Sequence, residues 1–339
     1  PKQELLSFIE ISENEVFKRA KIVKGIGKIK EFFQNKGYAF ANVNSVVNKS
    51  ADKLDISINV KADKRIYISR IEISGNNRTQ DDVIRGKIKI YEGSYYSKSE
   101  FVESINSIKR LGYFSKVDYD LKRRLNESDV ADIFIEIEEA KTGEFTIGLS
   151  HSNSTGGALN AGISQSNILG TGKTLNAKFS NSEAVEEISF FFKDPDYNKF
   201  GHTISYGLFN SKLDASNIDA TSYTKDETGG IFGYGIPLSE FSNLYGELKV
   251  SNININCGSD LKNIYETEQC ASKEKLDMPI SLTYTFNNLN DNFFPTKGTL
   301  NKFTSSISSP ITDFKYIKNE LSHKSYYPVL DINNIKIFF

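Results

Sequence analysis

The side chains best suited to acid-base or metal chemistry are three histidines, and they lie far apart in the sequence. His151, His202 and His323 have neither the spacing of a metal site nor a nucleophile motif beside them. The run Gly170-Thr171-Gly172-Lys173 resembles a phosphate-binding loop, but the earlier glycine and the following helix of such a loop are missing. We interpret it as a hairpin turn. The sequence therefore predicts neither an enzyme nor a bound cofactor or metal.

The two cysteines can form a covalent cross-link. Cys257 and Cys270 both lie in a polar insertion, residues 252–277, between two alternating segments. In an oxidising compartment they would close a loop of about 14 residues, which the chain-entropy model values at around 3 kcal/mol. We expect a disulfide, and the alternative is two unpaired thiols.

From Gly143 onward the chain consists of segments in which apolar and polar side chains alternate. Because side chains on a strand point to opposite faces in turn, each segment has one apolar and one polar face. The turn signals between them give roughly ten strands and the start of another, each near the ~10 residues that a tilted membrane strand needs. The apolar positions are Phe145, Ile147, Leu149; Leu159, Ala161, Ile163; Ile188, Phe190, Phe192; Ile204, Tyr206, Leu208; Phe232, Tyr234, Ile236; Leu244, Leu248, Val250; and Ile280, Leu282, Tyr284, Phe286.

Four glycines crowd one of these segments, at positions 229, 230, 233 and 235. Glycine weakens strand pairing and marks bends or a close backbone approach, so we expect curvature there rather than a ligand site. The run Asp194-Pro195-Asp196 indicates a strand end followed by a turn.

The composition agrees with an ordered chain that carries such strands. The 339 residues are 38% hydrophobic and 25% charged, which fits two or more folded domains. The net charge of -1 excludes a strong electrostatic attraction to nucleic acid. The mean hydropathy of -0.40 is what alternation gives, and no run of ~18 apolar residues occurs. Residues 1–11 look like the interior of a domain and no leader precedes them, so we expect a fragment of a secreted precursor.

An α/β pattern occurs twice before Gly143. A helical stripe ends at Gly37 in the first copy and at Gly112 in the second, which sets the repeat at 112 - 37 = 75 residues. Ser97 and Glu100 have capping-box spacing at the start of the second stripe, and residues 79–82 would cap a short helix around Val83 and Ile84. The second copy has the order strand, helix, helix, strand, strand, which fits two helices on one face of a small mixed sheet. We therefore divide the chain into residues 1–63 (a partial unit), 64–140 (a complete unit) and 141–339 (alternating strands). The stripes are Ile22, Ile26, Ile29, Phe33 and Phe101, Ile105, Ile108, Leu111.

These motifs resemble the BamA family, the bacterial outer-membrane β-barrel assembly proteins, whose POTRA domains precede a barrel of the bacterial surface antigen superfamily. Gly75-Asn76, Glu92-Gly93 and the Leu-Gly-Tyr-Phe run at 111–114 resemble a POTRA domain. Residues 138–143 resemble the family's junction. Two further motifs resemble turns of the family's barrel: Asn167, Gly170, Gly172 and Phe294, Pro295, Gly298. The resemblance implies α+β POTRA domains (strand-helix-helix-strand-strand) followed by an antiparallel transmembrane β-barrel. Family barrels close at about sixteen strands, so we expect the barrel here to be incomplete.

The resemblance also implies three surfaces. The first barrel strand would form a seam with the closing strand and open to pair with a client strand; its residues are Glu144, Phe145, Thr146, Ile147, Gly148, Leu149 and Ser150. We expect this strand to be short. An accessory lipoprotein would dock on the second helical region, at Val83, Ile84, Lys87 and Lys89, where Lys87 replaces an acidic residue of relatives. An open edge of the POTRA sheet would accept an extended peptide by strand addition.

The function implied is that of an insertase in the outer membrane of Gram-negative bacteria. With its POTRA domains in the periplasm, it would receive unfolded β-barrel precursors and fold them into the membrane by strand pairing at the seam. Its partners would be unfolded outer-membrane proteins, accessory outer-membrane lipoproteins and the lipid bilayer, with no nucleic acid. Related translocation and assembly proteins and two-partner secretion transporters share these elements. A passive porin would not need the tandem unit, and a soluble all-β binding protein would pack its apolar face inside a sandwich.

Overall fold

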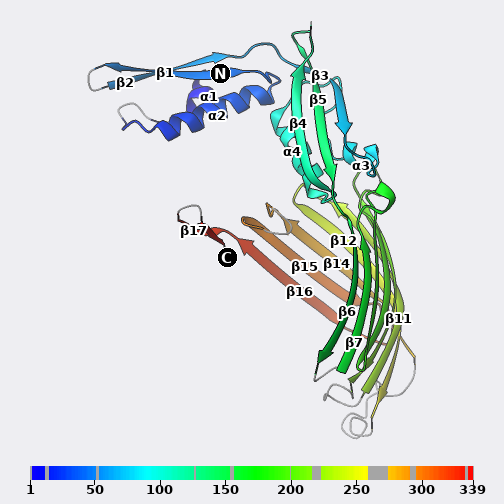
Figure 1. The fold of residues 1–339 in the computed structure, drawn as a ribbon. Helices are drawn as coiled ribbons and strands as arrows, with labels where there is room; N and C mark the ends of the chain where they lie inside the picture. Colours follow the sequence, from blue (N-terminus) through cyan, green and yellow to red (C-terminus); the bar gives the residue numbers. More distant parts are fainter. Residues whose placement is uncertain are drawn as a thin grey trace. The chain divides into compact units, whose positions relative to one another are not determined.

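The computed structural model describes residues 2–11, 15–50, 53–125, 127–152, 156–198, 200–215, 223–258, 274–290, 295–332 and 335–338 (Figure 1). The chain forms two compact units, Pro1–Ala140 and Lys141–Phe339. The first unit is α+β and the second is an antiparallel sheet, which confirms the fold class expected from the sequence. No helix in the described part of the chain is long and apolar enough to cross a membrane.

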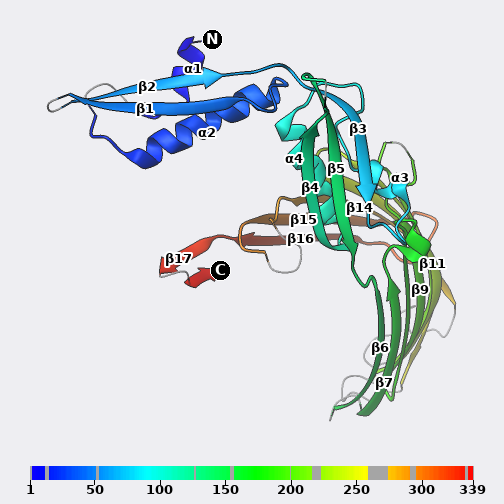
Figure 2. The ribbon, with the colours of Figure 1, turned by 45° about the horizontal axis from the view of Figure 1, so that its top comes forward.

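The first α/β motif contains the helices α1 (Lys2–Ser7) and α2 (Arg19–Asn35) and the strands β1 (Asn42–Ser50) and β2 (Lys53–Lys61). Helix α2 runs beside the antiparallel β1–β2 ribbon (Figure 2). It buries Ile22 and Ile29 of the predicted stripe and ends before Gly37. The φ of Gly37 is 97°, a backbone angle that glycine adopts readily and other residues disfavour.

The second α/β motif contains β3 (Tyr67–Ser74), α3 (Asp81–Arg85), α4 (Lys98–Arg110), β4 (Phe114–Arg123) and β5 (Val130–Glu139). The sheet order is β3-β5-β4, with β3 parallel and β4 antiparallel to β5. Ser97 caps α4 by accepting a hydrogen bond from the backbone nitrogen of Glu100. The core lies between the helices and the sheet and includes Ile66, Ile68, Ile84, Phe101, Ile105, Ile108, Ile133 and Ile135.

The helix α3 is the short helix expected around Val83 and Ile84. Its N-cap is Gln80 and its last residue is Arg85, so residues 86–90 of the region expected to dock a partner follow the helix as turns. Thr79, expected among the capping residues, instead donates its hydroxyl hydrogen to Glu139. The Thr79 side chain, which the local sequence predicts to cap the helix, therefore bonds to a carboxylate far away in the chain.

Several contacts hold the two α/β motifs together. The backbone nitrogen of Ile66 donates to the carbonyl of Gly37 at 2.8 Å, and Arg65 donates to the carbonyl of Lys36 at 2.9 Å. The Arg65 guanidinium also lies 3.8 Å from the centre of the Tyr95 ring. Because the contacts include the backbone, the motifs form one compact unit.

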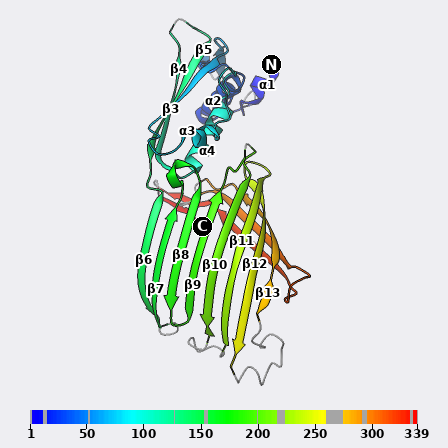
Figure 3. The same ribbon diagram turned by 90° about the vertical axis from the view of Figure 1, so that its right-hand side faces the viewer.

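The second unit is one curved antiparallel sheet (Figure 3). Its eleven strands are β6 (Gly143–Ser152), β7 (Gly156–Gln165), β8 (Thr174–Ser182), β9 (Val185–Asp194), β10 (Thr203–Asp214), β11 (Tyr223–Pro237), β12 (Ser242–Cys257), β13 (Lys275–Asp277), β14 (Pro279–Asn287), β15 (Gly298–Ser308) and β16 (Ile317–Tyr326). Neighbours in the sheet follow chain order, except that β14 pairs with β12 and the short β13 also pairs with β12. The strands β17 (Pro328–Ile332) and β18 (Ile335–Phe338) form a separate hairpin.

The apolar side of the alternating strands is exposed. Phe145 is 67% exposed and Leu149 is 84% exposed, and the same holds for large apolar side chains on β7, β9, β10 and β14. A water-soluble sandwich would instead cover this face with a second sheet. Exposed apolar rows on successive strands are the arrangement of a lipid-facing surface.

The glycines of β11 permit close packing on the other face of the sheet. The Tyr245 hydroxyl hydrogen-bonds to Ser205 Oγ at 2.5 Å, and this pair occupies the space that a side chain at Gly233 would need. Gly229 likewise faces Val250 and Ser251 too closely for a Cβ atom. The close approach expected from these glycines is therefore present across β10, β11 and β12.

Candidate functional site

The strand β6 is one edge of the membrane sheet. It pairs with β7 from Gly143↔Gln165 to Ser152↔Gly156, and β16 at the other end of the sheet pairs with β15. Within the described ranges neither edge strand has a second partner. The strand has ten residues, as many as β7, so the expectation of a short seam strand is wrong.

The side chains of β6 divide by face. Phe145, Ile147 and Leu149 are exposed on the apolar side, and Glu144, Thr146, Gly148 and Ser150 alternate with them. The outer edge therefore offers backbone N–H and C=O groups between an apolar face and a polar face. Such an edge can pair with another strand of similar alternation by main-chain hydrogen bonds.

The α/β sheet has two edges that differ in cover. On β3 the nitrogen of Ile68 donates to Ser94 at 3.0 Å, and the nitrogen of Tyr96 donates to Ile66 at 2.9 Å. The nitrogen of Ile71 donates to the Glu92 carboxylate at 2.8 Å. On the other side β4 pairs with β5 alone among the described residues. The structure thus identifies β4 as the more open edge, which the sequence left undecided.

The four residues expected to contact an accessory partner do not form one surface. Ile84 is fully buried in the core, so it is corrected from a contact residue to a core residue. Val83 and Lys87 are half-buried, and Lys89 is exposed. The Lys89 ammonium pairs with Glu103 of α4. The available surface is therefore Val83, Lys87 and Lys89 beside α4.

The two turns expected from the resemblance are organised by asparagine side chains. Asn167 is buried with a φ of 58° and accepts a hydrogen bond from the backbone nitrogen of Gly172 at 2.7 Å. It precedes a single 3-10 turn (Ile168–Gly170) between β7 and β8. The run Gly170-Thr171-Gly172-Lys173 thus lies in a turn between strands.

In the connection between β14 and β15, Asn290 Oδ1 accepts from the backbone nitrogens of Thr296 and Lys297 at 2.9 and 2.8 Å. Gly298 begins β15 with a φ of 111° and has no room for a side chain against Asn288. Pro295 lies in this connection, and Phe294 lies outside the described residues.

The remaining reactive side chains are dispersed. His202 hydrogen-bonds to Tyr234 and His323 to Asn301, each at 2.5 Å, and His151 lies on β6. Among the described residues no three His, Cys, Asp or Glu side chains are grouped as metal ligands. Cys257 ends β12, whereas Cys270 lies outside the described residues, so the disulfide stays a prediction.

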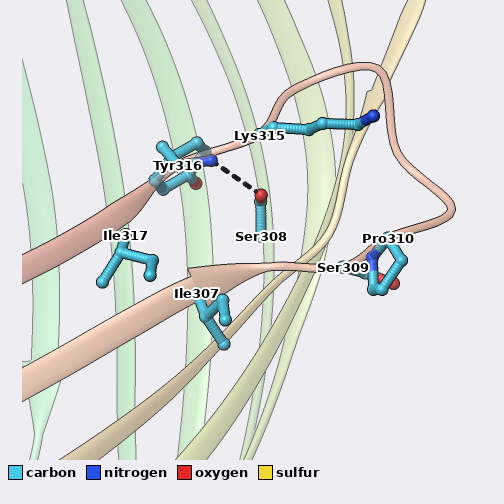
Figure 4. A pocket seen from close by; sticks show the side chains of 7 residues that line it. All are labelled: Ile307, Ser308, Ser309, Pro310, Lys315, Tyr316 and Ile317. Atoms are coloured by element: carbon cyan, nitrogen blue, oxygen red, sulfur yellow. Dashed lines mark hydrogen bonds between the residues drawn. The ribbon is translucent and has the colours of Figure 1, made fainter.

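A cavity of about 550 Å³ lies at the turn between β15 and β16, lined by Ile307, Ser308, Ser309, Pro310, Lys315, Tyr316 and Ile317 (Figure 4). Ser308 Oγ accepts a hydrogen bond from the Tyr316 backbone nitrogen at 2.9 Å. Burial, with the Asp277 carboxylate next to it, raises the pKa of Tyr316 to about 12. None of the residues expected to be functional lines this cavity, and a single lysine is its only charged lining group.

The hydrogen-bonded cluster around Glu139 was not predicted from the sequence. Glu139, at the end of β5, accepts hydrogen bonds from Arg78 and Thr79, which lie 61 and 60 residues earlier in the chain, respectively. The pair Glu138-Glu139 marked the junction in the sequence, but nothing in its spacing revealed a partner.

Tandem α/β motifs ahead of an antiparallel sheet with an exposed apolar face define a membrane β-sheet protein with POTRA-type units. Residues 167–338 match the Omp85 superfamily domain, and residues 1–63 and 66–140 each match the POTRA model, described as surface antigen variable number repeat. The chain belongs to the Omp85 superfamily.

Curated relatives include the outer membrane protein assembly factor BamA of Buchnera aphidicola subsp. Acyrthosiphon pisum, 28% identical over 291 residues, covering 77% of this chain and 46% of that protein. BamA of Neisseria meningitidis serogroup B is 25% identical over 260 residues, covering 76% of this chain and 33% of that protein. The chain therefore spans less than half the length of these two relatives.

Two solved structures share the fold. The crystal structure of BamA from Haemophilus ducreyi lacking POTRA domains 1-3 has a TM-score of 0.71 at 23% identity, covering 97% of this chain and 65% of that one. CdiB from Escherichia coli has a TM-score of 0.57 at 12% identity, covering 98% of this chain and 63% of that one.

Proposed function

We propose that this chain is part of an outer-membrane protein assembly factor that folds β-barrel precursors into the outer membrane. The observation that carries the proposal is the edge strand β6, which among the described residues pairs with β7 alone, within a sheet whose outer face is apolar and exposed. Family membership and the names of the two BamA relatives support it. The proposed division into domains stays at residues 64 and 141, with the α/β units in the periplasm.

Strand pairing supplies the driving force in this proposal. In the hydrocarbon core an unpaired backbone group costs several kcal/mol, because no water is present to bond it. A client strand that pairs with β6 satisfies groups on both strands at once. The reaction therefore needs no nucleotide, metal or catalytic side chain.

The edge of β4 is the proposed receptor for the client in the periplasm. Tyr119 is half exposed on β4, and its ring meets Phe101 edge-on at 5.0 Å. Main-chain recognition at such an edge tolerates many sequences, since the hydrogen bonds do not depend on side chains. That tolerance suits a receptor for unfolded precursors of varied sequence.

An accessory lipoprotein is the proposed partner of the surface formed by Val83, Lys87 and Lys89. Two cationic side chains beside a half-buried valine suit a partner with an acidic rim around an apolar contact. The ion pair between Lys89 and Glu103 orients one of these side chains before any partner arrives.

Depletion of the full-length protein in its own cell tests the proposal. We expect the level of many folded, heat-modifiable porins in the outer membrane to fall over the following generations, with unfolded precursors gathering in the periplasm. Loss of one secreted substrate with porins intact would instead identify a dedicated transporter of the kind that shares this fold.

A further inference from the structure

Glu139 is a largely buried carboxylate at the end of the first unit. Its side chain is 11% exposed, and it accepts hydrogen bonds from the backbone nitrogens of Arg78 at 3.1 Å and Thr79 at 2.8 Å. The Thr79 hydroxyl donates to its second oxygen at 3.1 Å. The Arg78 guanidinium donates to the carbonyl of Ala140 at 2.7 Å. The last two residues of the unit are thus fastened to Arg78 and Thr79.

The same loop leads directly into α3. Gly75, with a φ of 88°, packs so closely on the carbonyl of Ile137 that no side chain fits. The side chain of Asn76 donates to the carbonyl of Thr79 at 3.3 Å, and α3 begins two residues after Thr79. Residues 75–79 therefore connect the end of β5 to the start of the helix that carries Val83.

The neighbouring glutamate shows that burial is specific to one position. Glu138 is 65% exposed and lies 3.9 Å from Lys116, whereas Glu139 turns toward the loop. A charged acceptor bonds backbone N–H groups more strongly than a neutral one, and its loss removes the acceptor of the buried Thr79 and of the more exposed Arg78 nitrogen.

We propose that Glu139 is a positioning residue for the assembly function: it fixes the direction in which the chain leaves the α/β unit relative to α3 and the Val83, Lys87, Lys89 surface. The role rests on the function proposed above. Because the chain continues through residues 141 and 142 into β6, the residues that Glu139 fastens are those through which the surface and the strand are linked along the chain.

The test uses the full-length protein with Glu139→Ala, Glu139→Gln and the matched control Glu138→Ala. Backbone hydrogen exchange is followed at residues 76–85 and 140–143, and the initial rate of folding of a urea-unfolded barrel protein is measured in liposomes. For Glu139→Ala we expect at least tenfold faster exchange in both segments and a several-fold lower maximal folding rate. The client concentration for half-maximal rate should not change. Glu139→Gln should lie between the unaltered protein and Glu139→Ala, because its amide oxygen still accepts the backbone hydrogen bonds but carries no charge.

Three results would overturn the proposal. The first is exchange in Glu139→Ala equal to that in Glu138→Ala. The second is faster exchange throughout β5, including Ile133 and Ile135, which would show a role in stability alone. The third is an unchanged folding rate despite faster local exchange. If the unaltered protein accelerates no client, the proposed function fails and this role fails with it, whereas failure of the exchange measurement overturns only the role of Glu139.

Discussion

The Glu92 carboxylate accepts a hydrogen bond from the backbone nitrogen of Ile71 at 2.8 Å and so closes part of one edge of the α/β sheet. Arg85 donates to the carbonyl of the same residue, at 3.1 Å, so both backbone groups of Ile71 are occupied. Native sheets commonly cover edges in this way to prevent unwanted pairing. The cover on β3 leaves β4 as the more open edge for the strand addition that we propose.

Cross-linking should therefore distinguish the two edge strands. Tyr119 on β4 and Tyr67 on β3 are matched tyrosines, 51% and 40% exposed. With a photoreactive phenylalanine analogue at either position, we expect an unfolded barrel protein to be captured from position 119 and not from position 67. Equal capture at both positions, measured by the yield of cross-linked client, would contradict the assignment of β4.

A side chain at Gly233 should destabilise the membrane sheet. The hydrogen-bonded pair of Tyr245 and Ser205 fills the space beside Gly233, so Gly233→Ala forces a displacement that costs about 1–3 kcal/mol. Gly230→Ala is the control, because its nearest neighbours lie at 3.5 Å, an ordinary contact distance. The folded fraction can be followed in urea by heat-modifiable migration on a gel. The urea midpoint of unfolding should fall for Gly233→Ala only, and similar midpoints for both variants would refute the packing argument.

Alkaline pH should weaken the first unit through Tyr96. Burial, followed by the nearby Tyr119, raises the pKa of Tyr96 to about 12, above the 10.0 of an ordinary tyrosine. The folded state therefore holds the proton when the unfolded state loses it, so stability is complete below pH 10 and falls between pH 10 and about 12. The full loss is about 3 kcal/mol, and about half of it falls between pH 9 and pH 11. Urea unfolding of residues 1–140 at pH 9 and pH 11 measures it, and Tyr96→Phe should remove this part of the pH dependence; an unchanged slope would contradict it.

Charge reversal at Lys87 tests the accessory surface. If a partner with an acidic rim binds beside α3, Lys87→Glu should lower its recovery in a pull-down of the full-length protein by about tenfold or less, the range of a single charge contact at a rim. Lys109→Glu, at the exposed end of α4, is the matched control. Recovery that is equal for Lys87→Glu and the unaltered protein would remove Lys87 from the interface.

The elements whose geometry depends on residues near in the chain could be predicted from the sequence. Gly37 and Gly112, which ended the two helical stripes, have φ angles of 97° and 72° that disfavour other residues. Ser97 caps α4 because its acceptor and the Glu100 nitrogen lie three residues apart. Alternation predicted the exposed apolar face of the sheet, because the two-residue period of a strand is fixed by its backbone.

Long-range contacts were not predictable in this way. Ile84 was expected at the accessory-partner surface, but packing against α4 and the sheet buries it. Thr79 has the position of a cap, yet Glu139 takes its hydroxyl from 60 residues away. The cover of β3 by Glu92 depends on a loop returning to the sheet. Each contact is decided by tertiary structure, which a single sequence pattern does not contain.

Pairing of a client strand with β6 is the central claim, and disulfide trapping tests it most directly. In a Cys257→Ser, Cys270→Ser background, cysteine is placed at Thr146 on β6 or at Thr283 on β14, which is paired on both sides by β12 and β15. The client carries one cysteine at successive positions of its terminal strand. We predict disulfides from position 146 to a client position in register, and none from position 283. Equal yields from the two strands, or no bond from position 146 during active assembly, would contradict the account.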